Sequence, residues 1–459
     1  MSETLRVKSP FSQEVVGEYK MDTFVSAHLK FNLVSEAQKV WKKVPLETRV
    51  NAVKEALTYF TKNKEAIALD ISRQMGRPLK QSGGEVNGLL ERANYLCDIA
   101  VETLKPMPLP HKEGFYRAIE REPLGVIFVV SAWNYPLLVT VNSVVPALLA
   151  GNTVLLKHSS QTPAIGEHFV KAFSKLAGVS NLLEQLIIDH QTTGRVIEDL
   201  DIAHVVFTGS VEGGKQILKH TSKKYMQPQL ELGGKDAAYV AEDADLKHAA
   251  ETVVDGAMFN SGQSCCGIER AYVHKSVFPD FIKACQTVIA DYKLGDPLNL
   301  DTNLGPLVSE KASKIAEEQV SAAIKQGAKI ATGGKVEKIG KGYFFEPTLM
   351  IDVQQNMEIM QEENFAPILP VMPVDSLDQA IDLVNDSHYG LTSAIFTKDM
   401  DKAKTFAANV NTGTVFMNRC DYLDPALPWT GVKDSGCGSA LSHLGFLSVT
   451  RPKGLHFRK

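Results

Sequence analysis

One uncharged stretch decides the fold: residues 123–156, PLGVIFVVSAWNYPLLVTVNSVVPALLAGNTVLL, contain no Asp, Glu, Lys or Arg. A bilayer span needs about 20 apolar residues, but Asn134, Pro136 and Pro146 interrupt this stretch. The remaining pieces have the length of strands, and uncharged strands rich in Val, Ile and Leu are typical of a parallel sheet covered on both faces. The stretch therefore predicts the buried centre of a βαβ unit rather than a membrane helix.

The residues on both sides continue this alternation of short apolar runs and amphipathic segments. Such a pattern predicts a doubly wound α/β sheet, whose ligands bind beyond the carboxyl ends of its strands. We expect strands over 126–131, 153–157, 183–189 and 205–209, and helices over 136–149, 162–176, 193–200 and 213–222. Elsewhere we expect helices over 34–63 and 64–104, an arm strand over 115–121, and a second α/β run over 236–414 with helices near 246–260, 277–291 and 309–327 and a strand over 344–350.

The composition narrows the class of protein. A chain of 459 residues predicts two or three domains, and 44% hydrophobic with 22% charged residues excludes a disordered or fibrous protein. With 49 basic and 53 acidic residues, no general positive field is present to bind nucleic acid or anionic lipid. Six cysteines are too few for a secreted disulfide scaffold, and the first 20 residues lack the apolar stretch of a secretory signal. We therefore expect a cytoplasmic protein with reduced thiols.

Two short segments carry residues suited to catalysis. Residues 229–235, QLELGGK, place Glu231 in an apolar segment that ends on paired glycines, where the backbone can approach a ligand closely. An ordinary strand-end ion pair would explain Glu231 equally well. Residues 259–270, FNSGQSCCGIER, place Cys265 and Cys266 after a turn. Although most cysteines are inert and buried, free backbone N–H groups at a turn can lower the pKa of a thiol and favour a reactive thiolate.

From residue 74 to residue 436 the chain resembles the aldehyde dehydrogenase superfamily, in its non-acylating, NAD(P)-dependent branch. Each marker is short and weak alone, but the ordered set at the family's spacing is very specific. The markers are Gln74-Met-Gly-Arg-Pro78, Trp133-Asn-Tyr-Pro136, Phe207-Thr-Gly-Ser210, Glu231-Leu-Gly-Gly-Lys235, Gly262-Gln-Ser-Cys265, Gly295-Asp-Pro297, Glu363-Asn-Phe365 with Pro367, Val415-Phe-Met-Asn418 and Gly431-Val-Lys-Asp-Ser-Gly436.

The resemblance implies an α/β fold with a Rossmann-type cofactor domain, a second α/β catalytic domain and a β-arm for oligomerisation. We expect the dinucleotide-binding domain over 1–104 and 123–230, the catalytic domain over 231–434, and the arm over 105–122 and 435–459. The arm segments resemble the family's intersubunit strands and imply a homodimer or a homotetramer. We expect a small-molecule aldehyde as substrate, with no metal, nucleic acid or membrane partner.

The resemblance also assigns the chemistry. The Cys265 thiolate would add to an aldehyde, Asn134 with the Cys265 N–H would hold the resulting oxyanion, and hydride would pass to NADP or NAD. Glu231 would then act as general base for the water that hydrolyses the thioester. For the cofactor the resemblance implies Ser131, Trp133, Lys157, Ser160, Phe207, Gly209, Ser210, Gly214, Leu232, Glu363 and Phe365. For the substrate it implies Tyr135, Leu138, Ser264, Cys266, Arg419 and Trp429.

Some residues depart from the family pattern. No Gly-x-Gly-x-x-Gly follows the first strand, and Ser160 stands where many members have an acid that repels the 2′-phosphate of NADP. We therefore expect NADP to be accepted at least as readily as NAD, unless Asp189 repels the phosphate instead. The acid that many members carry after the final Gly-x-Gly is absent, so deacylation would depend on Glu231 alone. Cys266 is either structural or a redox modulator of its neighbour.

The substrate stays open at this point. Members that act on carboxylate-bearing semialdehydes tend to have Arg in the helix after the Trp-Asn-Tyr-Pro motif, but residues 140–143 are uncharged. Nonpolar or weakly polar aldehydes are therefore the default, while a carboxylate contact by Arg419 would permit succinic semialdehyde. A CoA-acylating dehydrogenase and a non-catalytic binding protein are the rivals. A cysteine hydrolase would need His248 or His274 as partner, and neither lies in a recognisable motif.

Overall fold

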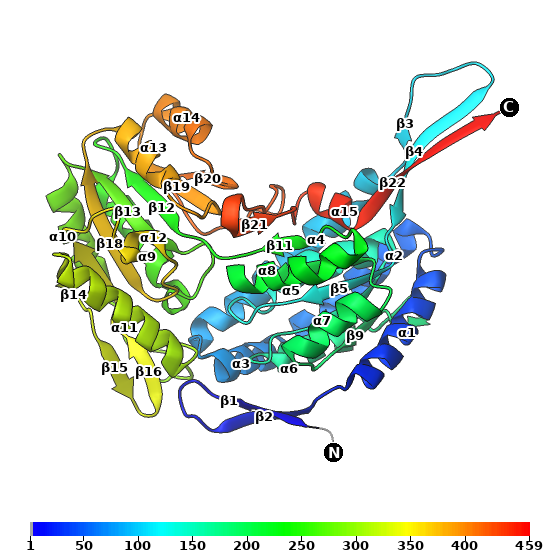
Figure 1. Cartoon of the computed structure of the whole chain (residues 1–459), viewed down its shortest axis with the longest axis horizontal. Coiled ribbons are helices and arrows are strands. Elements are labelled where there is room, and N and C mark those ends of the chain that lie inside the picture. Colours follow the sequence, from blue (N-terminus) through cyan, green and yellow to red (C-terminus); the bar gives the residue numbers. More distant parts are fainter. Residues whose placement is uncertain (1–2) are drawn as a thin grey trace.

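A six-stranded sheet forms around the uncharged stretch in the computed structural model, which describes residues 3–459 (Figure 1). Its strand order is β21-β11-β10-β5-β6-β9, and only β21 runs antiparallel to its neighbour. The strands are β5 (Val126–Val130), β6 (Thr153–Lys157), β9 (Leu183–Gln185), β10 (His204–Thr208), β11 (Gln229–Glu231) and β21 (Gly436–Cys437). The helices around it are α1 (Phe24–Trp41), α2 (Leu46–Lys62), α3 (Lys64–Met75), α4 (Leu79–Leu104), α5 (Leu138–Ala150), α6 (Pro163–Phe173), α7 (His190–Asp199) and α8 (Val211–Thr221).

The central strand β5 is buried on both faces, as its composition predicts. Ile127 and Val129 pack into the same core as α2, α4 and α5, whereas Phe128 and Val130 pack into a second core with α1 and α7. Helix α5 ends where Gly151 adopts a left-handed φ of 95°. The doubly wound sheet is therefore confirmed, although the strand expected over 183–189 stops at residue 185 and the helix expected over 162–176 stops at residue 173.

The two long helices predicted upstream are four shorter ones, α1 to α4, because breaking residues divide them. Pro45 caps the start of α2, and Asn63 separates α2 from α3. Gly76, with φ of 83°, ends α3, and Pro78 precedes α4. Proline lacks the N–H that a helix interior needs, and a left-handed glycine is a common helix terminator.

The second body is built on a seven-stranded sheet, in the order β14-β17-β18-β13-β12-β19-β20. The strand predicted over 344–350 is split, because Pro347 lies between β16 and β17. The strands are β12 (Asp236–Val240), β13 (Ile268–His274), β14 (Lys329–Thr332), β17 (Thr348–Ile351), β18 (Ile368–Val374), β19 (Thr392–Phe396) and β20 (Thr414–Met417). The helices are α9 (Leu246–Met258), α10 (Phe278–Ile289), α11 (Glu310–Lys325), α12 (Glu358–Gln361), α13 (Leu377–Asn385) and α14 (Met400–Asn409).

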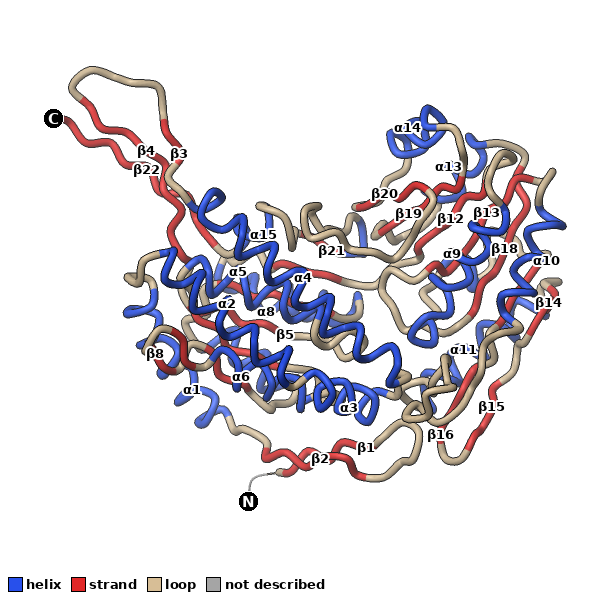
Figure 2. Tube along the Cα trace, turned by 180° about the vertical axis from the view of Figure 1, so that it is seen from behind, coloured by secondary structure: helices blue, strands red, loops and turns tan. Residues whose placement is uncertain are grey.

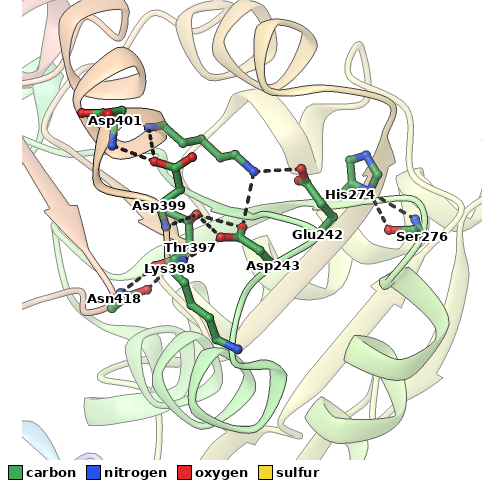
Figure 3. A network of polar contacts seen from close by, with 10 residues as sticks. Glu242, Asp243, His274, Ser276, Thr397, Lys398, Asp399, Asp401 and Asn418 are labelled. Carbon is green, nitrogen blue, oxygen red and sulfur yellow. Dashed lines mark hydrogen bonds and ion pairs between the residues drawn. The ribbon is translucent and has the colours of Figure 1, made fainter.

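A polar network closes the carboxyl end of β12, where the chain turns away from the sheet (Figure 3). Asp243 accepts hydrogen bonds from the Thr397 hydroxyl at 2.8 Å and from the Lys398 N–H at 2.9 Å. Lys402 bridges Glu242, at 2.8 Å, and Asp243, at 3.4 Å. These contacts join β12 to the segment between β19 and α14, and so they stabilise the sheet at that end.

A three-stranded arm projects from the first body and carries the carboxyl terminus (Figures 1 and 2). Its strands are β3 (Met107–Pro108), β4 (Phe115–Pro123) and β22 (Thr450–Arg458), preceded by α15 (Leu444–Ser448). Smaller antiparallel pairs are β1 (Thr4–Lys8) with β2 (Val15–Lys20), β7 (Lys175–Leu176) with β8 (Val179–Ser180), and β15 (Val336–Ile339) with β16 (Gly342–Phe345). Among residues 3–459, no helix combines the length and the apolar character that crossing a membrane requires.

Candidate active site

A crevice of about 320 Å³ lies where the two sheets face each other. The six-stranded sheet supplies residues that follow the carboxyl ends of β5, β10 and β11, whereas the seven-stranded sheet supplies residues that precede the amino ends of β12, β13 and β18. Nine of the predicted site residues line it together, namely Trp133, Asn134, Gly209, Ser210, Glu231, Leu232, Cys265, Glu363 and Phe365. The remaining lining residues are Ala132, Thr208, Gly233, Ala312, Ile315 and Asn364.

The thiol turn, residues 260–265, has an unusual backbone. Asn260, Ser261 and Gly262 have φ angles of 54°, 58° and 70°, so three consecutive residues are left-handed. A Cβ on Gly262 would lie 2.2 Å from the Ala366 carbonyl oxygen, so this position requires glycine. The turn leads directly to Cys265, which is partly exposed in the crevice. In the described part of the chain, the Cys265 backbone N–H makes no hydrogen bond.

The environment of Cys265 differs from the sequence expectation in one respect. The neighbouring Cys266 thiol and burial raise the pKa of Cys265 well above its usual value, whereas a lowered pKa was expected from the turn. No His, Lys or Arg forms an ion pair with it among residues 3–459, so no cation of the chain stabilises a resting thiolate. Activation of this thiol therefore requires a base.

Asn134 is held by its backbone, which leaves its side chain available. Its carbonyl oxygen accepts hydrogen bonds from the Arg77 guanidinium and from Asn260 Nδ2, the latter at 3.1 Å. Asn260 also binds Arg77 Nε through Oδ1 at 3.0 Å and the Gln263 carbonyl at 3.0 Å. Arg77 and Asn260 therefore connect the Asn134 loop to the thiol turn. The Asn134 side-chain amide has no hydrogen-bond partner among residues 3–459 and lines the crevice.

Arg77 also forms a buried ion pair with Glu85, whose Oε1 accepts the Leu137 N–H at 2.7 Å. We predict that Arg77→Met lowers the free energy of unfolding by about 3–5 kcal/mol, because it leaves the Glu85 charge buried without a partner. Urea unfolding followed by fluorescence would measure this. The control is Lys247→Met, which removes an exposed pair with Glu251 and should cost less than about 0.5 kcal/mol. A loss below about 1 kcal/mol for Arg77→Met would contradict the prediction.

Glu231 lies at the end of β11 with its carboxylate in the crevice. Its oxygens accept hydrogen bonds from Gln229 Nε2 at 3.1 Å and from Thr208 Oγ1 at 3.3 Å. Burial raises the pKa of Glu231 to about 7, and these two hydrogen bonds limit the rise. A carboxyl group with a pKa near neutrality can accept a proton and release it at physiological pH, as a general base must.

The opposite wall is positioned by a buried ion pair. Lys235 Nζ lies 2.8 Å from Glu269, whose carboxylate accepts the backbone N–H groups of Asn364, at 2.8 Å, and of Phe365, at 3.0 Å. Glu363 accepts the Gly234 N–H at 3.0 Å, and burial raises the pKa of Glu363 to about 8. The loop that carries these residues is therefore fixed by a side chain of the neighbouring strand β13.

Aromatic and helix-end groups face the crevice from both sides. The Phe365 ring meets the Trp133 ring edge-on, with centroids 5.8 Å apart. Ser210 caps α8, and its Oγ accepts the Gly213 N–H at 3.2 Å. The N-terminal N–H groups of α8 therefore lie beside Gly209 and Ser210, where a helix dipole favours an anionic ligand such as a pyrophosphate.

Several predicted residues lie outside this crevice. Lys157, at the end of β6, is 7% exposed and has no hydrogen-bond or ion-pair partner among residues 3–459 for its ammonium group. Asp189 caps α7 by accepting the Thr192 N–H at 2.7 Å, and this hydrogen bond lowers its pKa. The other predicted cofactor residues outside the crevice are Ser131, Phe207, Gly214 and Ser160, the last of which is exposed in a separate hollow beside β1.

Five of the six predicted substrate residues are buried or half-buried, and Arg419 is exposed. Cys266 and Trp429 are buried in one core, and Leu138 packs against it. Tyr135 lies under the Arg77 guanidinium, 4.4 Å from the ring centroid. Ser264 is buried, with its hydroxyl 3.5 Å from the Cys266 sulfur. Arg419 is exposed, and its guanidinium stacks on Tyr422 at 3.9 Å.

Sequence reasoning missed several residues of the site. Arg77 was quoted only as part of a motif, and Asn260 only as part of the thiol segment, yet both connect the Asn134 loop to the thiol turn. Thr208 and Asn364 line the crevice. All four are polar residues inside motifs quoted from the sequence, and this polarity was the signal that could have identified them.

Comparison with known proteins finds relatives of one family. The chain matches the model of the aldehyde dehydrogenase family over residues 1–455. A mitochondrial aldehyde dehydrogenase of Leishmania tarentolae is 33% identical over 99% of this chain and 91% of its own length. An NADP(+) succinate-semialdehyde dehydrogenase of Deinococcus radiodurans is 30% identical over 97% of this chain and 93% of its own. The crystal structure of lactaldehyde dehydrogenase from Escherichia coli is similar at a TM-score of 0.96 and 28% identity, over 100% of this chain and 96% of the other.

Proposed function

Since this chain belongs to the aldehyde dehydrogenase family, an NAD(P)-dependent family of enzymes, we propose that it oxidises an aldehyde to a carboxylic acid through a covalent adduct on Cys265. The observation that carries the proposal is that Cys265, Glu231 and Asn134 line one crevice together with Gly209 and Ser210. A nucleophile, a base, an oxyanion donor and an anion-binding helix end therefore line one crevice.

The described residues fit a dinucleotide. Lys157 is a buried cation without a partner of its own, and the N-terminus of α8 offers N–H groups beside the crevice. In the proposal Lys157 holds a ribose, α8 holds the pyrophosphate, and Glu363 holds the second ribose. The dinucleotide, when bound, accepts a hydride from the substrate carbon.

The first step forms a bond between the Cys265 sulfur and the carbonyl carbon. Because the pKa of Cys265 is raised, the thiol proton must move to a base as the sulfur attacks, and Glu231 has a pKa suited to accept it. The carbonyl oxygen becomes an anion, which the free Asn134 amide and the free Cys265 N–H stabilise by about 3–4 kcal/mol each. The product of this step is a hemithioacetal.

Loss of the hydride converts the hemithioacetal into a thioester on Cys265. Glu231 first releases the thiol proton to solvent, then takes a proton from water as the water oxygen bonds to the thioester carbon, and passes that proton to the departing sulfur. The carbon–sulfur bond breaks, the thiol is restored and the carboxylic acid leaves. We assign only Glu231 to this step, since the acid that many members carry after the final Gly-x-Gly is absent.

The test is the absorbance of reduced nicotinamide, measured with purified protein, NADP or NAD, and a panel of aldehydes. We expect cofactor reduction and a carboxylic acid product without CoA. No reduction with any aldehyde would overturn the proposal, and a strict need for CoA would identify an acylating enzyme instead.

Cofactor choice gives a prediction at Ser160. We expect wild-type protein to use NADP at least as readily as NAD, because no carboxylate stands at this position and Asp189 is engaged in capping α7. Ser160→Glu should lower kcat/KM for NADP about 100-fold relative to NAD, since a carboxylate would repel the 2′-phosphate. Ser160→Gln, which has the same shape without the charge, is the control. A hundredfold preference of the wild-type protein for NAD would refute this prediction.

The proposal also gives each part of the chain a role. We assign dinucleotide binding to 1–104 and 123–230, catalysis to 231–434, and subunit contact to the arm strands β3, β4 and β22 of the predicted segments 105–122 and 435–459; β21 of the latter segment belongs to the six-stranded sheet. The arm carries exposed Met107, Tyr116 and Phe457, which supports a role in association as a homodimer or homotetramer. A cytoplasmic location stays a prediction from the cysteines and the amino-terminal sequence.

A further inference from the structure

Six lysine and arginine side chains are buried in the described part of the chain, and four of them are well satisfied. Arg77 and Lys235 pair with buried carboxylates, and Arg49 and Arg270 donate to several backbone carbonyls. Lys157 has no partner, and the proposed function assigns it to the dinucleotide. The sixth is Arg92, which the proposed function does not use.

Arg92 lies on α4 and is 7% exposed. A guanidinium has five N–H donors, yet within residues 3–459 this one makes a single hydrogen bond, from Nη1 to Asn142 Oδ1 at 3.2 Å. No carboxylate of the described chain lies within 4.0 Å of it. Burying an unpaired charge is costly, so the free donors call for an anionic partner.

The free donors of Arg92 are not completely enclosed. Five side-chain N or O atoms of the described residues are fully enclosed without a partner, and none belongs to Arg92 or Asn142. Asn142 lies on α5, one turn after Leu138. Because Arg92 on α4 donates to it, the Arg92 and Asn142 side chains lie at the junction of α4 and α5. The remaining N–H groups of the guanidinium and the Asn142 amide are therefore available to one ligand.

The junction lies next to the nucleophile. Cys266 follows Cys265 directly and is buried in the core that α4 and α5 share, and Cys265 packs against the same core. Burial raises the pKa of Glu231, and the charge of Arg92 partly offsets that rise. Leu89 and Ala93, which flank Arg92 on α4, belong to this core as well, so the guanidinium lies near the thiol segment and its charge acts on Glu231.

We propose that Arg92, together with Asn142, binds a carboxylate at the far end of the substrate, so that this enzyme acts on short aldehydes that carry a carboxylate. The inference rests on the proposed function and names its substrate class. A guanidinium binds a carboxylate through two parallel hydrogen bonds, which fixes orientation as well as charge. It replaces the expectation of a nonpolar aldehyde, which considered residues 140–143 and Arg419 as sources of a cation but not Arg92. Arg92 contacts Asn142 of that segment from α4, whereas Arg419 is exposed and stacked on Tyr422.

The test compares succinic semialdehyde with butanal, which has the same carbon chain without the charge. We expect wild-type kcat/KM to favour the semialdehyde, and we expect Arg92→Met to lower that preference about 100-fold, mainly through KM. Arg92→Lys should restore part of it. Arg49→Met is the matched control, because it removes another buried arginine outside the junction and should leave the preference unchanged. The ratio within one variant is independent of how much of it is folded.

Succinate binding gives a readout that does not require turnover. By calorimetry, wild-type protein should bind succinate and Arg92→Met should not, with the thermal midpoint of each variant recorded to confirm folding. An unchanged substrate preference in folded Arg92→Met, or equal succinate binding, would overturn the inference. Reduction of the cofactor with butanal and not with the semialdehyde would overturn it as well, while supporting the proposed function. Absence of cofactor reduction with every aldehyde of the panel would overturn the proposed function, and succinate binding would still decide the role of Arg92.

Discussion

Replacing Cys265 with alanine should lower the rate of cofactor reduction by a factor on the order of 10⁴ or more, to the background of the assay. The reason is that an aldehyde carbon gives up a hydride readily only after a nucleophile has converted its carbonyl oxygen into an anion. Asn134 and the residue-265 N–H would still be present in the variant, but they would have no charge to stabilise. A continuous absorbance assay with saturating cofactor measures the effect.

Cys266→Ser is the matched control for this prediction. Cys266 is 6% exposed and packs in the core, so serine there should cost some stability but leave most of the activity. Alkylation of the wild-type protein by iodoacetamide, followed by peptide mass analysis, should label Cys265 first because Cys265 is the partly exposed member of the pair. Full activity in Cys265→Ala, or its loss in Cys266→Ser alone, would transfer the nucleophile to Cys266 and refute the assignment.

At pH 9, where hydroxide can take the proton of the Cys265 thiol, Glu231→Gln should leave a burst of reduced cofactor while steady turnover falls by about 10²–10⁴-fold. The amide keeps the shape of the side chain and its contact with Thr208, but it cannot accept a proton from water. The burst persists if attack of the thiol can use another base at high pH, so stopped-flow measurement at pH 9 separates the two steps. Equal steady rates for the two proteins would remove Glu231 from deacylation.

The wild-type protein should show the matching pH dependence. Because burial raises the pKa of Glu231 to about 7, the carboxyl holds its proton below that pH and is an active base above it. Steady turnover limited by deacylation should therefore fall about tenfold per pH unit below pH 7 and level off above it. Glu231→Gln should lose this dependence, and a profile that is flat between pH 5.5 and 7 would contradict the assignment.

Burial on both faces explains why the centre of the first sheet could be predicted closely. Thr153–Lys157 appears at the expected bounds and Val126–Val130 ends one residue before the expected residue 131, because a strand covered on both faces is uncharged except at its end, where Lys157 lies. Cys265, Glu231 and Asn134 could be identified because their short motifs occur in a fixed order. Breaks inside amphipathic helices were missed, since Pro45 and Gly76 interrupt segments whose apolar pattern continues on both sides.

The second wall of the crevice could not be predicted from strand patterns. The expectation was that ligand-binding residues follow carboxyl ends, which holds for Asn134 and Glu231. Cys265 and Glu363 instead precede the amino ends of β13 and β18, because the second sheet presents its opposite edge. How two sheets face each other depends on packing between residues far apart in the sequence. Arg92 was missed for a related reason, since a charged residue in an amphipathic helix usually faces water.

The left-handed turn before the thiol has a consequence for how this protein can evolve. Gly262 touches the Ala366 backbone directly, just after the loop that carries Glu363 and Phe365. Because no side chain separates the two backbones, a displacement of that loop also displaces the thiol turn and the Cys265 sulfur. We therefore expect a substitution in one of the two segments to require a compensating substitution in the other.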